Sequence, residues 1–509
     1  MLQKRWFRVL FRYRVFVALL LIVQVVVMLQ LILNSSQAAE WINYALHLIS
    51  LLVALHIVIR KNKGAYKLTW VFLILMFPIF GGFLYLMFTY QSSTRKFQKR
   101  LDAIQSETEK YYASGAGVCT DAAQKAPAYE THMRYLEKHA HFSVYEHTQT
   151  QYFSPGEAFF ESLLEAVKQA EHYVFLEYFI VQEGKMWNSI LDVLFEKAKQ
   201  GVDVRLIYDD MGCFFLLPKD YAKFLRKHGI KTHVFNPFRP FLSTIQNNRD
   251  HRKIAVIDGK IAFTGGINLA DEYINEIEKH GHWKDAGVRL EGAAAWSFAV
   301  MFLQMWELCA NEKADYESFK PDIVLPESDG LVLPYADSPM DTDNVCEHVY
   351  LQMINSAKRY VYINTPYLIL DDSMVSALCL AAKSGVDVKI VTPHKWDKRF
   401  VHFTTRSYYR ELMNAGVEIY EYSKGFVHAK TFVCDDAVAT VGTANLDFRS
   451  LYLHFECGVW MYESRAVKEL YDDYVQTLKV CQRITKADCT KNPIVRLFEE
   501  IFRLFAPLM

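Results

Sequence analysis

Long apolar runs dominate the first hundred residues, whereas the rest of the chain alternates between short apolar and amphipathic segments. Residues 15–33 form a nineteen-residue run without charge, and further apolar runs cover residues 43–59 and 68–88. A helix of about 20 apolar residues can cross a hydrocarbon core of about 30 Å. The pattern therefore predicts a membrane-spanning helical region over residues 1–100, with three candidate spans.

Alternatives exist for two of these runs and for their orientation. The first run is too long for a signal peptide and lacks a small-residue cleavage site, which favours a retained anchor. The third contains Pro78, Gly81 and Gly82, so a kinked or re-entrant segment is an alternative to a full span. Basic residues precede the first run and also follow the third. Three spans would place these clusters on opposite sides, so charge does not assign a side to the remaining chain.

Beyond residue 100 the alternation is typical of an α/β fold, and it occurs twice. The stretch "AEHYVFLEYFIV" at 170–181 matches "AKRYVYINTPYL" at 357–368. Likewise, "AKQGVDVRLIYDD" at 198–210 matches "AAKSGVDVKIVTP" at 381–393. We expect two copies of one β-α-β-α-β unit, each a mixed β-sheet flanked by helices, related by a pseudo-twofold axis.

This repeat sets the expected domain boundaries. The two copies should cover residues 151–325 and 326–490, with residues 101–150 as a linker. Residues 491–509 should form an amphipathic C-terminal helix, because apolar and charged residues fall on opposite faces at helical spacing. Such a face suits either packing against a protein core or lying at a membrane interface.

Each copy carries the motif H-x-K-x-x-x-x-D followed by a glycine-containing turn and an asparagine. The motif residues are His251, Lys253, Asp258 and Asn268 in the first copy, and His428, Lys430, Asp435 and Asn445 in the second, at a constant offset of 177. On a strand the histidine and the lysine would share one face, because side chains alternate with period two. Two copies packed by matching faces would bring two imidazoles and two ammoniums to one cleft.

That set of side chains suits phosphoryl transfer through a covalent phospho-histidine. One imidazole would attack phosphorus, and the other would protonate the leaving alkoxide and then deprotonate the incoming alcohol. The lysines would hold the phosphodiester charge, with the two asparagines as neutral donors to its oxygens. No metal or other cofactor is needed. Asp258 and Asp435 complete the candidate catalytic motif, although their spacing places them where the strand ends and favours a role in fastening the turn.

Each histidine also needs an acidic partner that fixes its tautomer. Asp285 and Glu456 stand at matching places in the two copies, 34 and 28 residues after His251 and His428. We expect Asp285 to orient His251 and Glu456 to orient His428. Glu177 is a further candidate, which either reaches the cleft or caps a strand.

Charge and cysteine content narrow the function further. The chain has 57 basic and 57 acidic residues, so no overall field would attract a nucleic acid. A membrane-tethered nuclease therefore fits the chemistry but not the charge balance. The nine cysteines are scattered singly without a C-x-x-C pair, which indicates buried thiols rather than a disulfide framework or a metal site.

The repeated motif resembles the phospholipase D superfamily, and within it the bacterial cardiolipin synthases. The stretches "DHRKIAVIDGKIAFTGGINLADEY", "HWKDAGVRLEG" and "FVHAKTFVCDD...GTANLDFRS" carry this resemblance, as does the "W...P..GG.LY" pattern near the N-terminus. Three features depart from the family pattern. Thr443 stands where many relatives have Ser, Asp250 stands where Asn or Thr is common, and the run at 15–33 is additional.

The resemblance implies a multi-pass enzyme of the bacterial cell membrane that transfers a phosphatidyl group between two phosphatidylglycerol molecules, giving cardiolipin and glycerol. By family analogy His251 would be the nucleophile and His428 the acid and base, an assignment that sequence symmetry alone does not make. A hydrolytic phospholipase D, or a phosphodiesterase acting on another lipid, is the nearest alternative, because water and alcohol compete for the same covalent intermediate. Headgroup specificity and oligomeric state stay open.

Overall fold

The structure is a computed structural model of the chain. It describes residues 37–60, 63–77, 92–113, 117–119, 121–238, 244–489 and 492–508, together with Ile22, Val26, Leu29, Gly81, Gly82 and Tyr85. Two compact units divide it. The first comprises Met1–Lys96, Phe238–Asn247 and Leu504–Met509, and the second comprises Phe97–Pro237 and Asn248–Arg503.

The first unit contains two apolar helices, α2 (Gln37–Ile59) and α3 (Gly64–Met76). They pack together around Ile57, Trp70 and Ile74. Within the described ranges, one helix is long and apolar enough to cross a membrane, and it covers Glu40–Ile59. With 13 residues, α3 is about 20 Å long, which falls short of a full span.

The expectation of a multi-pass protein is therefore not supported by the described part of the chain. Among the described residues, the predicted span at 43–59 coincides with a helix of sufficient length. The predicted span at 15–33 lies outside the described residues apart from three single positions, and the predicted span at 68–88 is described only in part.

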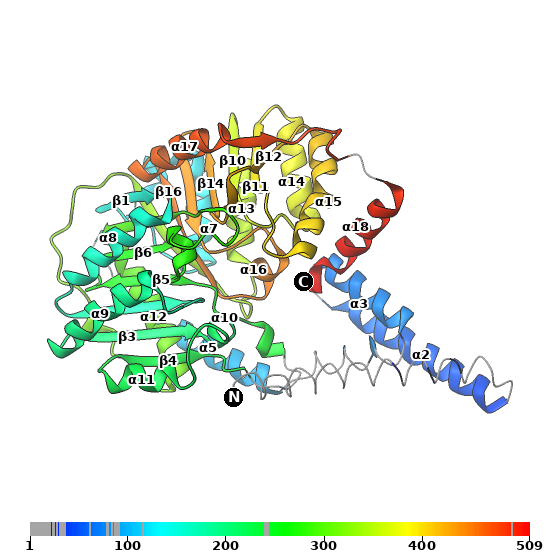
Figure 1. Cartoon of the computed structure of the whole chain (residues 1–509), viewed down its shortest axis with the longest axis horizontal. Coiled ribbons are helices and arrows are strands. Elements are labelled where there is room, and N and C mark those ends of the chain that lie inside the picture. Colours follow the sequence, from blue (N-terminus) through cyan, green and yellow to red (C-terminus); the bar gives the residue numbers. More distant parts are fainter. Residues whose placement is uncertain are drawn as a thin grey trace. The chain divides into compact units, whose positions relative to one another are not determined.

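Two mixed β-sheets form the centre of the second unit (Figure 1). The first contains β1 (Thr148–Phe153), β2 (Tyr173–Tyr178), β3 (Asp203–Asp209), β4 (Lys231–Phe235), β5 (Lys253–Ile257), β6 (Ile261–Gly265) and β8 (Gly287–Gly292). The second contains β9 (Leu331–Asp337), β10 (Tyr360–Asn364), β11 (Asp387–Pro393), β12 (Glu418–Tyr422), β14 (Thr431–Cys434), β15 (Val438–Gly442), β16 (Glu456–Tyr462) and β17 (Cys481–Arg483).

The strand orders confirm the predicted duplication. The first sheet runs β4-β3-β2-β5-β6-β8-β1, and the second runs β12-β11-β10-β14-β15-β16-β9, with β17 added beside β12. In each copy the first three of these strands are parallel and the next four are antiparallel. Strand β6 packs against its counterpart β15, so matching elements meet, as expected for a pseudo-twofold pair.

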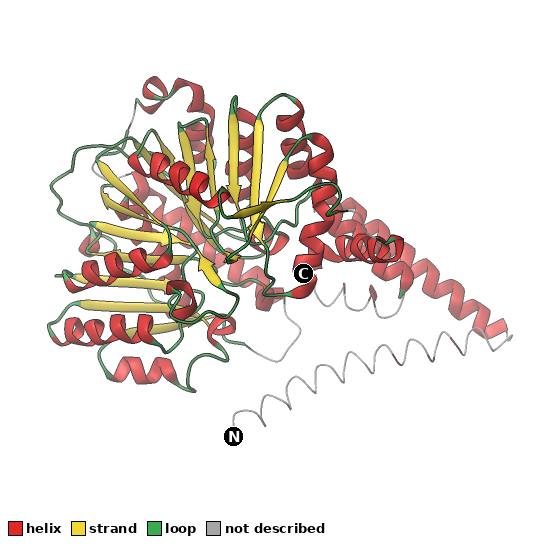
Figure 2. Cartoon of the chain, turned by 45° about the horizontal axis from the view of Figure 1, so that its top comes forward, coloured by secondary structure: helices red, strands yellow, loops and turns green. Residues whose placement is uncertain are grey.

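Helices cover the faces of both sheets (Figure 2). Those of the first copy are α8 (Gly156–Lys168), α9 (Lys185–Lys199), α11 (Tyr221–Lys227) and α12 (Ala295–Ala310), and those of the second are α13 (Val345–Ser356), α14 (Asp372–Lys383), α15 (Arg399–Ala415) and α17 (Arg465–Leu478). Gly201 and Gly385 follow α9 and α14 with φ of +93°. This left-handed conformation turns each chain from a helix into the next strand, as the sequence predicted.

The segment interpreted from the sequence as a linker, residues 101–150, is folded onto both copies. It contains most of α5 (Ser92–Ala113) together with α6 (Ala122–Lys125) and α7 (Glu130–Lys138). The Tyr112 hydroxyl donates a hydrogen bond to Gln304 of α12 at 3.0 Å, and Tyr135 bonds His348 of α13 at 2.6 Å.

A C-terminal helix, α18 (Pro493–Phe505), follows the second copy. Its apolar residues Ile494, Leu497 and Phe498 are exposed, whereas Glu499 is buried. Near its end, Arg503 forms an ion pair with Glu411 of α15 at 2.7 Å. The helix is amphipathic as predicted, and part of its apolar face is open.

Candidate active site

Each catalytic-motif histidine lies immediately before its strand, not on it. The sequence predicted a strand position, but β5 begins at Lys253 and β14 begins after Lys430. The histidine backbones instead bond across to the other copy. The amide of His251 donates to the Phe455 carbonyl at 2.9 Å, and that of His428 donates to the carbonyl of Lys284 at 2.7 Å.

Two short parallel pairings produce these contacts. In one, β13 (Gly425–Val427) pairs with β7 (His282–Lys284), and in the other Asp250 bridges Phe455. In each pairing, the segment of one copy is followed directly by a motif histidine. The paired segment of the other copy is followed directly by a carboxylic acid. The local pairing therefore places an acid beside each imidazole.

The acids and histidines pair across the two copies. Nδ1 of His251 lies 2.9 Å from Oε1 of Glu456, and Nδ1 of His428 lies 2.6 Å from Oδ2 of Asp285. Both predicted acids thus contact a motif histidine, but each contacts the histidine of the other copy, so the predicted pairing within each copy is wrong. With Nδ1 held by a carboxylate, Nε2 of each imidazole is the nitrogen left for substrate. The two histidine side chains are 10% and 9% exposed.

Burial lowers the pKa of both imidazoles. Burial, followed by the charges of Lys253 and Lys430, holds the pKa of His251 well below its usual value. Burial and Lys430 lower the pKa of His428 to about 4. A neutral imidazole can act as a nucleophile or a base. Because Lys430 of the second copy acts on His251 of the first, the charges of both copies meet at one site.

The two lysines are buried beside the histidines. Burial lowers the pKa of Lys253 to about 8 and that of Lys430 to about 7. Each ammonium donates to the backbone carbonyl of its own motif histidine. Nζ of Lys430 also lies 2.9 Å from Nδ1 of His428. These ammoniums are positioned to neutralise an anionic phosphodiester.

The pKa values of the two acids shift in opposite directions. Burial tends to raise the pKa of Asp285, but the charge and hydrogen bond of His428 outweigh this effect, and the pKa lies below its usual value. Burial raises the pKa of Glu456, and the charge of Lys253 offsets only part of that rise. Asp285 accepts a hydrogen bond from the Ala286 amide at 2.8 Å, whereas Glu456 accepts one from the Thr443 hydroxyl.

The motif aspartates fasten the strand ends, as their spacing indicated. The carboxylate of Asp258 accepts hydrogen bonds from three successive amides, of Glu171, His172 and Tyr173, at 2.7 to 2.8 Å. Asp435 makes the same contacts with Lys358, Arg359 and Tyr360. These carboxylates are occupied by backbone amides at the start of β2 and β10, and their inclusion among the candidate catalytic residues stays a prediction.

The two asparagines are buried but differ in their bonds. Asn268 accepts from the Ile180 amide at 3.0 Å and donates to the Tyr273 hydroxyl at 2.7 Å. The side-chain oxygen of Asn445 is buried without a hydrogen-bond partner among the described residues, and Asn445 bonds Asp447. The second asparagine thus keeps more capacity for a ligand.

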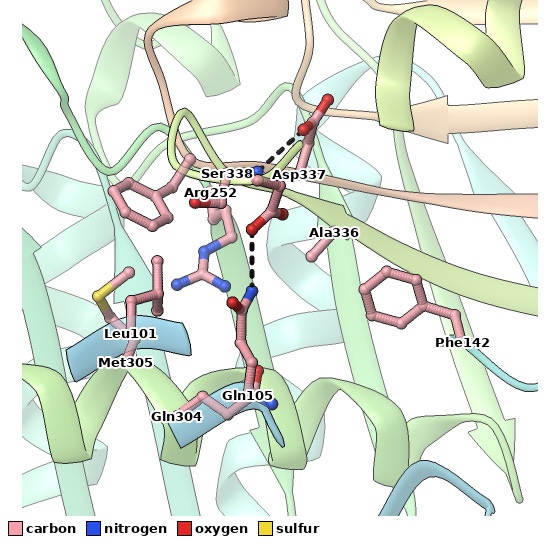
Figure 3. Close-up of a pocket in the computed structure, with 11 residues that line it drawn as sticks. Leu101, Gln105, Phe142, Arg252, Gln304, Met305, Ala336, Asp337 and Ser338 are labelled. Carbon is pink, nitrogen blue, oxygen red and sulfur yellow. Dashed lines mark hydrogen bonds between the residues drawn. The ribbon is translucent and has the colours of Figure 1, made fainter. Parts of the chain in front are cut away.

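Glu177 belongs to a buried ion network. Among the described residues, it forms an ion pair with Arg252 and not with either imidazole. Its Oε1 lies 2.7 Å from Nε of Arg252, which also approaches Asp250 at 3.4 Å. The Arg252 guanidinium lines a small cavity of about 30 Å³, together with Gln105 and Asp341, which hydrogen-bond each other at 3.3 Å (Figure 3). The histidines do not line this cavity, so it is separate from the catalytic site.

Sequence analysis missed His454, which stands beside the first imidazole. Its ring centroid lies 5.6 Å from that of His251, and its Nδ1 lies 3.8 Å from Glu456. Its counterpart in the first copy is Trp283, two residues before Asp285, whose ring lies 5.1 Å from that of His428. The matched strings "HFE" and "WKD" carried this signal.

His251, His454 and Glu456 also place one ligand-type atom each within 4.8 Å of one another. Such a group could hold a metal ion. The buried ammoniums of Lys253 and Lys430 act against a dication at this position. The absence of a metal requirement stays a prediction.

Comparison with known proteins places this geometry in a family. The family model described as cardiolipin synthase, PLD-like domain, matches twice, over residues 163–286 and 350–478. The model described as phospholipase D-nuclease N-terminal matches residues 48–88. The chain is similar to a solved structure, the phosphatidylserine synthase of Haemophilus influenzae Rd KW20. The sequences are 13% identical, the TM-score is 0.55, and the match covers 71% of this chain and 95% of that one, which shows a shared fold.

Similar curated proteins cover nearly the whole chain. An uncharacterized protein of Streptococcus mutans is 44% identical over 87% of this chain and 96% of its own length. The cardiolipin synthases of a Geobacillus species and of Alkalihalophilus pseudofirmus are 37% and 35% identical, over 90% and 89% of this chain and 91% of each relative. Fold and site together define a phosphatidyltransferase of the phospholipase D superfamily. Within that class, the chain belongs to the cardiolipin synthase family.

Proposed function

We propose that the protein is a cardiolipin synthase that transfers the phosphatidyl group of one phosphatidylglycerol to the hydroxyl of a second and releases glycerol. Its family membership and the names of its relatives support this activity. The observation that carries the proposal is the pair of crossed contacts, His251 with Glu456 and His428 with Asp285, which leaves one Nε2 in each copy for a shared phosphorus.

In the proposed first step, Nε2 of His251 attacks phosphorus and the bond from phosphorus to the glycerol oxygen breaks. His428, which takes up a proton from solvent as the anionic substrate binds, gives this proton to that oxygen, so glycerol leaves and a nitrogen–phosphorus bond holds the phosphatidyl group. In the second step, the hydroxyl of another phosphatidylglycerol gives its proton to His428. Its oxygen attacks phosphorus, and the nitrogen–phosphorus bond breaks.

The difference between the two acids supports these roles. The residue that acts as acid and base must become an imidazolium, and an ionised carboxylate stabilises that cation. Asp285 beside His428 has the lowered pKa, whereas Glu456 beside His251 has the raised one. A bound phosphodiester anion would also raise the pKa of His428, because it favours the charged ring.

The surrounding polar residues complete the proposed site. Lys253 and Lys430 would hold the phosphate charge, and Asn445 would contact a phosphate oxygen. Asp258, Asp435 and Asn268 would support the site through the backbone and side-chain bonds that they already make.

The proposed location is the bacterial cell membrane. The apolar helix at Glu40–Ile59 and the family match at 48–88 support an anchor in this region. We also propose a second crossing, supported by the charge-free run at 15–33. Topology reporters fused at the N-terminus, after residue 36 and after residue 62 would test it. Two crossings place the reporter after residue 36 on the opposite side from the other two, whereas a single crossing at Glu40–Ile59 places the first two on the same side.

The activity test uses purified full-length protein and phosphatidylglycerol, with the lipids analysed by mass spectrometry. A four-chain product formed together with free glycerol supports the synthase. Phosphatidic acid as the sole lipid product would instead support the alternative, a hydrolase in which water takes the place of the second lipid. A phosphorylated protein band that survives base but is lost in acid would report the covalent nitrogen–phosphorus intermediate during turnover.

A further inference from the structure

Exposed aromatic residues lie in two segments that are linked through side-chain contacts to the two motif histidines. We propose that residues 211–215 and 396–400, together with the open face of α18, form a surface that enters the headgroup layer of the bilayer carrying the substrate. This inference rests on the proposed function, because it takes the substrate to be a membrane phospholipid.

The two segments occupy equivalent places in the two copies. Residues 211–215 follow β3, and residues 396–400 follow β11, the matching strand. Phe215 is 66% exposed, and Trp396 and Phe400 are 51% and 64% exposed. Large apolar side chains exposed at one functional edge mark an interaction surface.

The first segment is tied to the nucleophile side of the site. Asp209 at the end of β3 accepts hydrogen bonds from the amides of Met211 and Gly212 at 2.8 and 3.1 Å. The same carboxylate forms an ion pair at 2.7 Å with Arg249, two residues before His251. Position 212 also packs so closely on the Phe179 carbonyl that a Cβ there would lie 2.0 Å from it. The Phe179 ring lies 5.0 Å from the ring of His251.

The second segment is tied to the other histidine. Asp397 accepts a hydrogen bond from the Tyr367 hydroxyl, and Nζ of Lys398 lies 5.7 Å from the centre of the same ring. The Tyr367 ring lies 6.5 Å from that of Phe426, which in turn lies 6.1 Å from the ring of His428. The charge of Lys398 also acts on His251, so this segment lies within electrostatic reach of the nucleophile.

Helix α18 extends the surface. The ring of Phe400 lies 5.5 Å from that of Phe502 on α18. On the same helix, Ile494, Leu497 and Phe498 are 64%, 60% and 55% exposed. An amphipathic helix with an open apolar face is suited to lie in the plane of a membrane interface.

The charges favour an anionic bilayer as the occupant. Lys395, Lys398 and Arg399 are exposed, whereas the carboxylate of Asp397 is held by Tyr367. Aromatic and basic side chains together prefer the headgroup level, where anionic lipids attract lysine and arginine. The catalytic imidazoles are only about one-tenth exposed. A phosphorus atom of a bilayer lipid can therefore reach them only if the protein surface next to the site meets the bilayer.

The test compares two forms of one substrate. Full-length protein in nanodiscs would receive either long-chain phosphatidylglycerol within the disc, or dihexanoyl phosphatidylglycerol dissolved in water around discs of phosphatidylcholine. We expect the double variant Trp396→Ala, Phe400→Ala to lower turnover of the disc-borne lipid at least tenfold and to change turnover of the dissolved lipid less than twofold.

A matched control is Leu380→Ala. Leu380 is 64% exposed like Phe400, but it lies near the end of α14, and α14 ends just before β11 begins, so it sits at the opposite end of the sheet from residues 396–400. We expect it to change turnover of either lipid less than twofold. Equal turnover of the disc-borne lipid by the double variant and the wild type would overturn the proposal, as would a parallel loss on both lipids. Wild-type protein that yields only phosphatidic acid would contradict the synthase activity. The comparison of turnover between disc-borne and dissolved lipid would still test membrane contact.

A second measurement reads the contact directly. Tryptophan fluorescence would be recorded in discs with brominated lipids for the wild type and for Trp396→Phe, and the difference isolates Trp396 from the other eight tryptophans. We expect brominated lipid to quench this difference signal by at least half. An unquenched difference signal would exclude membrane contact at this position.

Discussion

His251 and His428 are held by the same backbone arrangement, a short parallel pairing to the segment that carries the other copy's acid. Their side-chain surroundings nevertheless differ. His251 faces a glutamate with a raised pKa and stands beside His454, whereas His428 faces an aspartate with a lowered pKa and packs against Trp283. The duplication thus fixed the geometry, and substitutions around it gave the two imidazoles different electrostatic settings.

A glycine and a threonine explain how acids of different length fit matching positions. Gly266 and Thr443 occupy the same place in the repeat. A Cβ on Gly266 would lie 2.0 Å from Oδ1 of Asp285, so glycine leaves the space that this carboxylate occupies. On the other side, the Thr443 hydroxyl donates to the longer Glu456. One acid is therefore held by close packing and the other by a hydroxyl.

The largest effect should come from the histidines themselves. We expect His251→Ala and His428→Ala each to lower cardiolipin formation by on the order of 10³-fold or more, because each removes a reacting group. Only the His428 variant should still accumulate a phosphorylated protein from radiolabelled phosphatidylglycerol in a single turnover. Full activity in either variant would contradict the shared site, and a phosphorylated His251→Ala protein would reverse the assigned roles.

The next largest effect tests the crossed pairing. We expect Glu456→Gln and Asp285→Asn each to lower turnover by roughly 10²-fold, because an amide no longer stabilises the correct imidazole tautomer. Rapid-quench measurements should separate them. Glu456→Gln should slow formation of the phosphorylated protein, and Asp285→Asn should slow its breakdown. If each acid served the histidine of its own copy, the two variants would show the opposite pattern.

Substitution by alanine should lower turnover by different amounts at the glycine and the threonine. Gly266→Ala should lower turnover by about tenfold or more, because the added methyl displaces Asp285 from His428. Thr443→Ala should lower it only about twofold to fivefold, since it removes the hydroxyl that bonds Glu456 and the Cys457 backbone but leaves space and does not displace the acid. Steady-state assays with thermal unfolding midpoints as the fold control would compare them. A milder effect for Gly266→Ala than for Thr443→Ala would contradict the packing argument.

A smaller and pH-dependent effect should come from the lysines. With pKa values of about 8 and about 7, Lys253 and Lys430 lose their protons as the pH rises through this range. We expect kcat/KM to fall above about pH 8, because the neutral amines no longer attract the phosphodiester. Lys430→Arg should retain activity to higher pH than Lys430→Gln, since a guanidinium stays charged.

Stability should change with pH in the opposite direction. The folded-state pKa of each lysine lies below the unfolded value, so the unfolded chain binds more protons between about pH 7 and 10.5. This contribution to the free energy of unfolding therefore increases with pH. A thermal midpoint that falls together with kcat/KM would attribute the activity loss to unfolding and contradict the lysine explanation.

Much of the fold could be predicted because it is recorded in local sequence patterns and in their repetition. The constant offset between the motifs identified two copies, and Gly201 and Gly385 marked where helix passes to strand. The spacing of Asp258 and Asp435 also placed them correctly at the strand ends. These features depend on backbone conformation and on periodicity, both of which a single sequence records.

The crossed pairing could not be predicted because it depends on contacts between the copies. Asp285 is closer in sequence to His251 than to His428, so proximity along the chain favoured the wrong partner. The histidines were placed on strands because the following residues are strongly apolar, whereas pairing of their backbone with the other copy delays the strand start. The partner of Glu177 could not be predicted for a similar reason. Glu177 pairs with the buried Arg252, which stands in the sequence between two residues of the catalytic motif.

The motif aspartates should give the smallest effect on turnover. We expect Asp258→Ala and Asp435→Ala to change kcat less than about threefold under conditions where the protein stays folded, because neither carboxylate reaches the imidazoles. Stability should change instead. Asp258 is buried and its loss leaves three amides without an acceptor, which should cost about 2 to 3 kcal/mol.

Asp435 offers the internal comparison for this prediction. Asp435 itself is only half-buried and its bonds to the Lys358 and Arg359 amides are exposed, so water can replace the carboxylate and the cost should be about 1 kcal/mol. Both aspartates have positive φ, of +51° and +55°, a conformation that asparagine tolerates. Asp258→Asn should therefore recover part of the stability lost in Asp258→Ala, as measured by denaturant unfolding of the detergent-solubilised protein. A large loss of kcat in a fully folded Asp258→Asn protein would show that this carboxylate acts in the chemistry after all, because only its charge would have changed.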